Sequence, residues 1–422
     1  MKIGLNARGA KVGKIALNSY PIFKFFVVFL SYFNFIDFTT LNNSPIWENY
    51  LHNFATIDLS SNNSISFFAL LRIHKIYRIM SFLGFFKFLT QEIAIDLGTA
   101  NTLIIHNDQV VVDEPSIVAI DRSTNKIVAV GKKAMMMHEK THENLKTIRP
   151  LKDGVIADFN AAEGMLREMI KLVYPKKPMF PPSWRMVICI PSSITEVEKR
   201  AVRDSAEQAG AKEVYMIHEP MAAALGIGID VEEPTGNMII DIGGGTTGIS
   251  VIALAGIVCD QSIRIAGDEF TGDIMEAMRR YHSLMIGERT AEQIKIHVGS
   301  ALKELDNPPD DIAVNGRDLV TGIPKQIMVT YQEVAEALDK SIFKIEEAIL
   351  KALESTPPEL AADIYRRGLY LTGGGALLRG LDKRISHKIK LPVHVADDPL
   401  RAVVRGTGMA LKNIARMPFL MK

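Results

Sequence analysis

Hydrophobic residues recur along this chain at two spacings, and each spacing predicts a different kind of element. From residue 330 to 356 they fall three and four positions apart, which puts them on one face of a helix. Elsewhere short unbroken apolar runs, such as 187–190, 214–217 and 238–240, stop at Pro, His or Asp and predict buried strands. The alternation of the two patterns is typical of an α/β fold. Capping-box spacing predicts three further helix starts, at Asn160 with Glu163, Thr195 with Glu198, and Thr290 with Gln293.

Two segments repeat one order: apolar strand, aspartate, glycine-containing turn, apolar strand. The first is built on Asp96 and Gly98, and the second on Asp241 and the three glycines 243–245. Backbone N–H groups of residues that lack a Cβ can converge on an anion, and threonine hydroxyls add donors, so both turns suit a polyphosphate. The two aspartates are 145 positions apart, about one domain's length. The chain is therefore predicted to contain two related halves that face one cleft, although hairpin turns without any ligand would also explain the glycines.

Two more segments carry candidate chemistry. A third glycine turn, Gly373-Gly374-Gly375, follows a strand-like run. His218-Glu219-Pro220 lies between a predicted strand and the next helix, where a carboxylate can hold a water molecule near a bound phosphate. The alternative for Glu219 is a charge that only complements the helix dipole.

Composition excludes some functions and separates the first ninety residues from the rest. A net charge of +1 argues against an extended nucleic-acid surface, and Cys189 and Cys259 show neither metal-ligand nor disulfide spacing. Of the 19 phenylalanines, 14 lie in residues 1–90. The apolar run 25–33 is shorter than the roughly 20 residues of a spanning helix. It resembles a signal-peptide core, but no small-residue cleavage site follows it cleanly, so a low-complexity extension is the favoured interpretation.

The motifs occur in an order that resembles a known superfamily. DLGTANT, IPSSITEVEKRA, EPMAAALG, DIGGGTT, LTGGGALL and DPLRAVVRGTG follow one another as in the actin/Hsp70/sugar-kinase superfamily. Within it, residues from about Phe82 to about Ala415 resemble the MreB family of bacterial actins. The resemblance implies an actin-like ATPase fold, with two α/β halves that each carry a small insert subdomain and a nucleotide between them. The expected boundaries are 92–224 with an insert at about 113–145, 225–396 with an insert at about 259–323, and a connecting helix in 397–422 that returns to the first half.

The resemblance also implies the site. ATP and Mg²⁺ are the expected cofactors, with Asp96 and Asp241 orienting the hydration shell of the metal, since Mg²⁺ usually keeps several waters. Glu219 and Thr246 are expected to position the attacking water. His218 stands where members of the family usually carry an acidic residue. The expected nucleotide contacts are Asp96, Gly98, Thr99, Ala100, Asn101, Thr102, Asp241, Gly243, Gly244, Gly245, Thr246, Thr247, Glu292, Gln293, Ile294, Lys295, Gly373, Gly374, Gly375, Ala376 and Leu377.

The implied function is that of an ATP-dependent bacterial actin that polymerises, hydrolyses ATP slowly, and organises cell-wall elongation and cell shape. Its expected place is the cytoplasm, peripheral on the inner face of the plasma membrane. Its expected partners are further copies of itself in paired filaments, the inner membrane surface, and the elongation proteins MreC, MreD and RodZ, with no nucleic acid. Two alternatives stay open: a sugar kinase of the same superfamily, for which no general-base aspartate can be nominated, and a membrane-tethered nucleotide-binding scaffold without turnover.

Membrane contact is expected at two places. Residues 80–91 resemble the short amphipathic start of such a chain, with Phe82, Leu83, Phe85 and Phe86 suited to a bilayer interface. Met179 and Phe180, in a loop whose prolines exclude a helix, form the second place. A hydrophobic lead-in to the first strand and a plain proline loop are the alternatives. We expect a chain that begins at Met80 to be fully functional, which makes residues 1–79 an extension that a mis-assigned start would explain.

Overall fold

The structure is a computed structural model that describes residues 90–140, 142–173 and 183–422. The predicted membrane-contacting residues Phe82, Leu83, Phe85, Phe86, Met179 and Phe180 lie outside these ranges. In the described part of the chain, no helix combines the length and the apolar character needed to cross a bilayer.

The first large sheet has five strands in the order β10-β9-β1-β2-β3. Strands β1 (Thr90–Leu97), β2 (Asn101–His106) and β3 (Gln109–Pro115) form an antiparallel meander. Strands β9 (Ser183–Ile190) and β10 (Ala211–His218) extend the sheet in parallel from β1. The second hydrophobic run of each predicted hairpin therefore returns directly beside the first.

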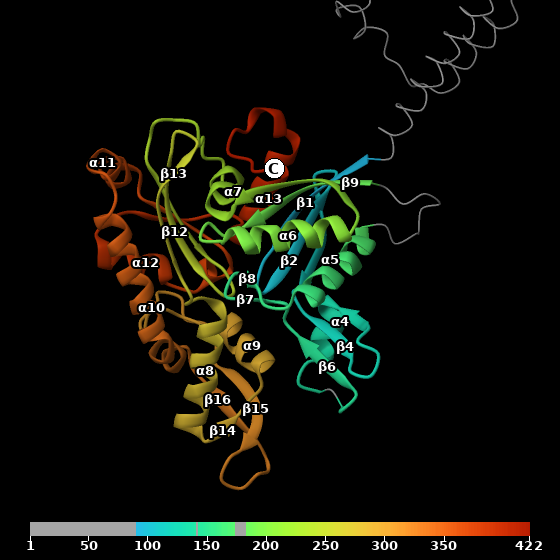
Figure 1. The fold of residues 1–422 in the computed structure, drawn as a ribbon. Helices are drawn as coiled ribbons and strands as arrows, with labels where there is room; N and C mark the ends of the chain where they lie inside the picture. The colour runs from blue at the N-terminus through green and yellow to red at the C-terminus, as the bar shows by residue number, and fades with distance from the viewer. Residues whose placement is uncertain (1–89, 141, 174–182) are drawn as a thin grey trace, which may run out of the picture. The chain divides into compact units, whose positions relative to one another are not determined.

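The second large sheet repeats this plan in the order β13-β12-β11-β17-β18. Strands β11 (Asn237–Ile242), β12 (Thr247–Ala253) and β13 (Gly256–Ile263) form the meander. Strands β17 (Leu369–Thr372) and β18 (Val393–Val395) add in parallel from β11. The repeated order confirms the prediction of two related α/β halves (Figure 1).

Helices separate and cover the two sheets. Helices α5 (Phe159–Val173) and α6 (Glu196–Gln208) share a buried cluster with one face of the first sheet, which includes Ile93 and Ile95. Helices α7 (Glu219–Gly226) and α13 (Ala402–Lys412) share a cluster with Ala94 of the first sheet and Ile239 of the second, so they lie between the sheets. The outer face of the second sheet packs against α10 (Tyr331–Glu354), and α11 (Pro358–Arg367) and α12 (Leu381–Ile389) complete this half.

Helices α7 and α13 cross at two glycines. A Cβ built on Gly226 would lie 1.8 Å from the carbonyl oxygen of Ala402, and one built on Gly406 would lie 1.8 Å from that of Ala222. Because any larger residue would force the backbones apart, these glycines set the distance between the helices that join the halves. Gly408 faces the first sheet instead, and a Cβ built on it would lie 3.3 Å from Cδ1 of Ile105.

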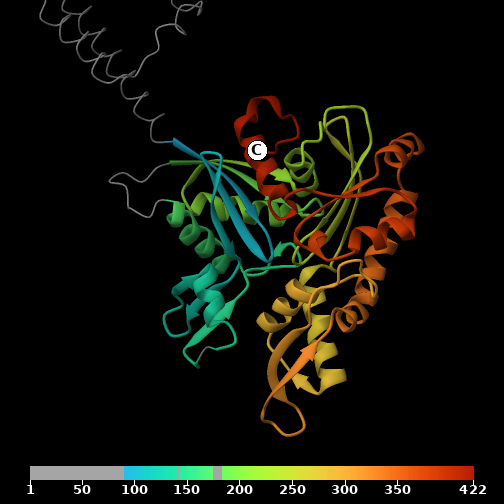
Figure 2. The ribbon, with the colours of Figure 1, turned by 180° about the vertical axis from the view of Figure 1, so that it is seen from behind.

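Each half carries a smaller group of elements toward one end (Figure 2). In the first half these are β4 (Val118–Asp121), β5 (Ile127–Val130), α4 (Gly131–Met137) and β6 (Leu145–Ile148), followed by the short hairpin of β7 (Leu151–Lys152) and β8 (Val155–Ile156). In the second half they are α8 (Gly267–His282), β14 (Leu284–Met285), α9 (Glu288–Val298), β15 (Ile312–Asp318) and β16 (Pro324–Val329). The exact boundaries of halves and inserts stay predictions.

The predicted helix starts have mixed outcomes. The capping box of Thr195 and Glu198 is confirmed, and the long helix predicted in 330–356 is α10. The other two boxes are wrong. Helix α5 begins at Phe159, with the carboxylate of Asp158 accepting from the N–H of Ala161, and α9 begins at Glu288 after Gly287, so Thr290 lies within its first turn.

Candidate functional site

A cavity of about 750 Å³ lies between the two halves, with lining residues from both. Most of the residues expected to contact nucleotide line it, together with the expected catalytic pair. They are Asp96, Gly98, Thr99, Ala100, Asn101, Glu219, Asp241, Gly243, Gly244, Gly245, Thr246, Glu292, Lys295, Gly373, Gly374, Gly375 and Leu377.

Five of the expected contacts do not line the cavity. Thr102 and Thr247 are fully buried: the Thr102 hydroxyl is 2.9 Å from that of Ser116, and the Thr247 hydroxyl donates to the carbonyl of Ile265 at 2.6 Å. Ile294 is fully buried in the core of the second half, and Ala376 is buried as well. Gln293 is exposed on the outer side of α9. Four of the five are therefore taken up by packing and sheet contacts, and Gln293 faces solvent away from the cavity.

The two predicted phosphate hairpins touch each other. A Cβ on Gly244 would lie 2.6 Å from the Cβ of Ala100, so a side chain there would collide with the first hairpin. A Cβ on Gly245 would lie 2.9 Å from the backbone nitrogen of Asp153, in the turn between β7 and β8. The next residue of that turn, Gly154, donates its N–H to the hydroxyl of Thr99 at 3.1 Å. Glycine is therefore required where the second hairpin meets the first hairpin and the turn between β7 and β8.

Helix α8 fixes the second hairpin from the other side. The N–H groups of Gly267 and Asp268 donate to the carbonyl oxygens of Gly243 and Gly244 at 3.1 and 2.7 Å. Because a trans peptide directs its C=O and the following N–H in opposite directions, the N–H groups of Gly244 and Gly245 point away from α8. Such oriented donors are what an anion site on a glycine turn requires.

Three carboxylates meet at the cavity. Burial and the nearby charge of Asp241 raise the pKa of Asp96 to about 7. Burial also raises the pKa of Asp241, while a hydrogen bond of 2.9 Å from the Thr372 hydroxyl opposes that rise. For Glu219, burial and the charges of Asp241 and Asp96 raise the pKa well above its usual range. These side chains are only half-buried by exposed area because they face the cavity, yet they lie deep enough for lost solvation to dominate.

This arrangement of carboxylates fits a nearby cation that does not have all three of them as direct ligands. Neighbouring carboxylate charges raise the pKa of Asp96 and of Glu219, and a positive charge among the three acids would relieve that repulsion. Among the described residues, no group of three or more His, Cys, Asp or Glu side chains is close enough to hold a metal ion directly. Asp96 and Asp241 would hold a Mg²⁺ ion through its water molecules, since Mg²⁺ usually keeps several of them.

The third glycine turn supports the second aspartate. Gly373 has φ +78°, and a Cβ on it would lie 2.7 Å from Oδ1 of Asp241 and 2.4 Å from the carbonyl oxygen of Ile242. Strand β17 places Thr372 opposite Asp241 in the parallel register. The turn therefore packs directly on the carboxylate that it helps to orient.

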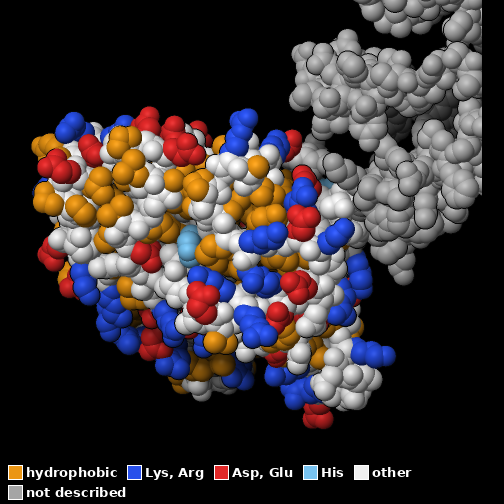
Figure 3. Space-filling model, turned by 45° about the horizontal axis from the view of Figure 1, so that its top comes forward, with side chains coloured by type: hydrophobic (Ala, Val, Ile, Leu, Met, Phe, Trp, Pro, Cys, Tyr) orange, Lys and Arg blue, Asp and Glu red, His pale blue; other side chains and the backbone are white. Residues whose placement is uncertain are grey.

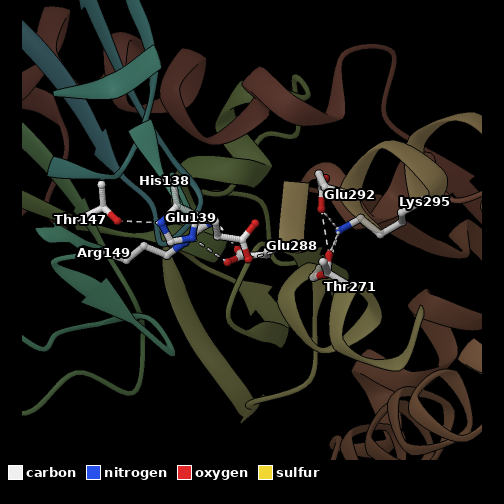
Figure 4. Close-up of polar contacts among 9 residues, drawn as sticks. His138, Glu139, Thr147, Arg149, Thr271, Glu288, Glu292 and Lys295 are labelled. Atoms are coloured by element: carbon white, nitrogen blue, oxygen red, sulfur yellow. Dashed lines mark hydrogen bonds and ion pairs between the residues drawn. The ribbon is translucent and has the colours of Figure 1, made fainter. Parts of the chain in front are cut away.

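At the second half's edge of the cavity, Lys295 is held in one place (Figure 4). Its Nζ is 2.6 Å from Oε2 of Glu292, 2.7 Å from the carbonyl oxygen of Gly267 and 3.0 Å from the hydroxyl of Thr271. Glu292 and Lys295 are three positions apart on α9, which explains why they share a face while Ile294 turns inward.

Several lining residues were missed by the sequence analysis. Asp268, Arg149 and Glu288 line the cavity, and burial raises the pKa of Asp268. Asp398 also lines it, ahead of Pro399, in the place that Glu219 and Pro220 occupy in the first half. The same acid-proline pair, at the start of α7 and shortly before α13, was a usable signal for Asp398. None existed for the others, because tertiary contacts bring them there.

Similarity to known proteins covers the same part of the chain. A sequence model of the family described as MreB/Mbl protein matches residues 90–418. The cell shape-determining protein Mbl of Bacillus subtilis (strain 168) is 46% identical over 329 residues, which are 78% of this chain and 98% of that protein. The cell shape-determining protein MreB of Escherichia coli (strain K12) is 49% identical over 333 residues, 77% of this chain and 94% of that one.

Solved structures agree with this similarity. The crystal structure of MreB 5 of Spiroplasma citri bound to AMPPNP has a TM-score of 0.73 at 38% identity, and covers 78% of this chain and 97% of that one. A MamK double helical filament has a TM-score of 0.63 at 23% identity over 78% of this chain and 100% of that one, which supports the actin-like fold alone.

Proposed function

The chain belongs to the MreB/Mbl family, and from this premise we propose that it is an actin-like ATPase that polymerises with ATP and takes part in determining cell shape. One observation carries the proposal most directly: two hairpins of the same plan meet at one cavity, each with a strand-end aspartate, Asp96 and Asp241. That geometry fits a charged polyphosphate and its metal.

The nucleotide would lie with its phosphates between the hairpins at 96–101 and 241–246. Its base and sugar would lie toward Glu292, Lys295 and the turn at 373–377. Bound Mg²⁺ would supply positive charge to the phosphates. The chain's own carboxylates Asp96 and Asp241 would orient the water shell of the metal, and Asp96, whose pKa is about 7, would do so in its ionised form.

Hydrolysis would depend on Glu219 and Thr246. Both line the cavity, and Glu219 begins α7 directly after β10. In its ionised form Glu219 would position and activate the attacking water, and the raised pKa makes that carboxylate a stronger base. The hydroxyl of Thr246 would fix the second hydrogen bond of that water.

Self-association is supported by relatives and by the surface. MreB 5 of Spiroplasma citri binds AMPPNP and ADP in its structures, and MamK forms a double helical filament. On the face in Figure 3, hydrophobic side chains gather in several groups between interspersed positive and negative charges. Among the described residues, large exposed hydrophobics include Val197, Val320 and Tyr365. We place the contacts between copies on such groups.

The cellular setting is part of the same proposal. Filaments would lie in the cytoplasm on the inner face of the plasma membrane, held by Phe82, Leu83, Phe85, Phe86, Met179 and Phe180, and would work with MreC, MreD and RodZ. Several aromatic side chains in an interface, each contributing roughly 1.5–3 kcal/mol, can hold a polymer even where one subunit binds weakly.

Sedimentation with nucleotide tests the function and separates the alternatives. The protein should pellet with ATP and Mg²⁺ and release phosphate, and it should stay in the supernatant without nucleotide. A sugar kinase would release ADP only when a hexose is added. A scaffold without turnover would bind ATP and release no phosphate. Absence of ATP-dependent pelleting at high protein concentration would overturn the proposal of polymerisation.

A further inference from the structure

Four charged or ionisable residues meet where the smaller groups of the two halves approach each other (Figure 4). We call His138, Glu139, Arg149 and Glu288 the Glu288 cluster. The first three belong to the first half, where His138 and Glu139 follow α4 and Arg149 follows β6. Glu288 is the first residue of α9, in the second half.

Glu288 accepts from the first half through both carboxylate oxygens. Oε1 forms an ion pair with Nη2 of Arg149, and Oε2 lies 3.2 Å from Nε2 of His138. The other ring nitrogen of His138 is 2.8 Å from the Thr147 hydroxyl. If that hydroxyl donates, the neutral ring keeps its proton on Nε2 and can donate to Glu288, so this contact does not require a charged histidine.

The backbone of the same residue makes a third contact. The N-cap of α9 is Gly287, which offers no side chain to the free N–H groups of the helix start. Glu139 supplies the missing acceptor from the other half, since its Oε1 accepts from the N–H of Glu288 at 3.1 Å. A Cβ on Gly287 would lie 2.2 Å from Oε2 of Glu139. Glycine at the N-cap therefore admits a capping carboxylate from across the cleft.

The Glu288 cluster lies at the edge of the cavity. Arg149 and Glu288 both line the 750 Å³ cavity, so the cluster bridges the halves at the cavity's edge. Its members are partly buried, with side-chain exposures of 22% for Arg149 and 32% for Glu288, which makes charged hydrogen bonds stronger than at an open surface. Among the described residues the Nε of Arg149 is buried without a hydrogen-bond partner, and Nη2 of the same guanidinium pairs with Glu288 across the cleft.

We propose that the Glu288 cluster is a latch that holds the two halves closed over the cavity and slows the exchange of a bound nucleotide. The proposal rests on the proposed function for its ligand, but the closure itself does not require nucleotide. Opening the cleft breaks all three contacts together, because every one of them ends on Glu288. Losing the charge of Glu288 should therefore weaken its two side-chain contacts, with Arg149 and His138, and leave the backbone bond to Glu139 in place.

The test uses the full-length protein preloaded with a fluorescent ATP analogue and chased with excess ATP. Glu288→Gln should release the analogue about tenfold faster, which corresponds to loss of about one charged hydrogen bond. Arg149→Gln should have a similar effect. The double variant should be no faster than Glu288→Gln alone, because that change already breaks the ion pair that Arg149→Gln removes. The matched control is Glu276→Gln, which removes a carboxylate paired with Arg279 and Arg280 inside α8, and its release should stay within about twofold of wild type.

A distance measurement separates closure from nucleotide contact. Spin labels are attached at Val128→Cys on β5 and Val320→Cys beyond β15, whose native side chains are 54% and 82% exposed. Cys259→Ser removes a native thiol that could also be labelled. The two labels report the distance between the smaller groups of the halves without nucleotide. Glu288→Gln, and independently Glu139→Gln, should lengthen or broaden this distance while thermal melting shows a folded protein.

Faster release with an unchanged distance would overturn the latch, because Glu288 would then act on the nucleotide directly. Unchanged release and distance in Glu288→Gln would overturn it as well. If the wild type fails to bind the analogue, the proposed function fails, and the distance measurement still decides the latch.

Discussion

The two hairpins at the cavity share a strand order and a strand-end aspartate, but different contacts hold them in shape. The first is supported by side chains of its own half: Ser116 donates to the carbonyl of Gly98 at 2.6 Å, and Thr99 accepts from Gly154. The second is supported by backbone bonds from α8 to Gly243 and Gly244. The first hairpin has residues with side chains at its turn, whereas the second has glycines where it contacts the first.

The same strand order is therefore stabilised by side-chain contacts in one half and by backbone contacts in the other. In the second hairpin, glycine is demanded by the neighbouring half at Gly244 and Gly245, and not by a left-handed φ at those positions. The aspartates differ as well. Asp241 accepts a hydrogen bond from the hydroxyl of Thr372, whereas the pKa of Asp96 is raised by the nearby charge of Asp241.

The largest effect is expected at Asp241. Replacing it with alanine should weaken binding of MgATP more than about 100-fold, because several kcal/mol of metal and phosphate stabilisation depend on that carboxylate. The fold should persist, since the side chain faces the cavity. Equilibrium binding and circular dichroism check both points, with the exposed Asp311→Ala as the control. Unchanged affinity would remove Asp241 from the site.

Glu219 should affect turnover and not binding. Glu219→Gln should lower the rate of phosphate release by roughly 100-fold or more, while ATP affinity changes little, because general-base assistance acts in the transition state. Filaments should still form with ATP.

The control for Glu219 is its counterpart in the second half. Asp398 is 3.8 Å from Arg401, so its carboxylate is already paired, and Asp398→Asn should slow release less than tenfold. Equal effects of the two variants would mean that the halves contribute equally to catalysis. Wild-type turnover in Glu219→Gln would leave only the role of a helix-terminal charge.

Asp96 should make the nucleotide-free protein sensitive to pH. Its pKa is about 7 in the folded protein and 3.8 when unfolded, so the folded form binds more protons between these values. The contribution of this residue to the free energy of unfolding is therefore complete below pH 3.8 and is lost as pH rises through 7. The loss amounts to at most about 4 kcal/mol.

Asp96→Asn should remove that dependence. Urea unfolding at several pH values, compared between wild type and variant, should show the stability difference growing in favour of the variant from about pH 4 to 7. Adding MgATP should stabilise the wild type and not the variant. A constant difference over this range would show that Asp96 is solvated in the folded protein.

Local patterns were sufficient for the strands and for the residues at the turns. Asp96, Asp241 and the glycines follow apolar runs directly, and a strand that ends in a turn presents its last residues at the sheet's edge. The same patterns could not separate neighbours on one element. Thr102 and Thr247 open the returning strands β2 and β12, where the pleat directs their hydroxyls into the protein, and the helical period of α9 directs Ile294 into the core.

Long-range contacts could not be predicted from local sequence. Arg149, Asp268 and Glu288 reach the cavity only because elements more than 100 residues apart in sequence, as Arg149 and Glu288 are, pack together. The wrong helix starts have a related cause. Asp158 caps α5 ahead of Asn160, and Gly287 is tolerated at the start of α9 because Glu139 supplies its acceptor.

The smallest expected effect tests why the second hairpin needs glycine. Gly244→Ala should lower the free energy of unfolding by about 1–3 kcal/mol, the usual cost of overpacking, because the new methyl group meets Ala100. Gly248→Ala is the matched control: it lies on β12, just beyond the same turn, and its Cβ would meet nothing within 4 Å. That change should be neutral or slightly stabilising. Urea unfolding without nucleotide and ATP binding are measured for both variants. If Gly244→Ala keeps its stability and loses only ATP affinity, the close approach of the nucleotide demands the glycine, and contact between the halves does not. If Gly244→Ala loses stability and ATP affinity together, contact with the first hairpin is what requires glycine at this position of the second.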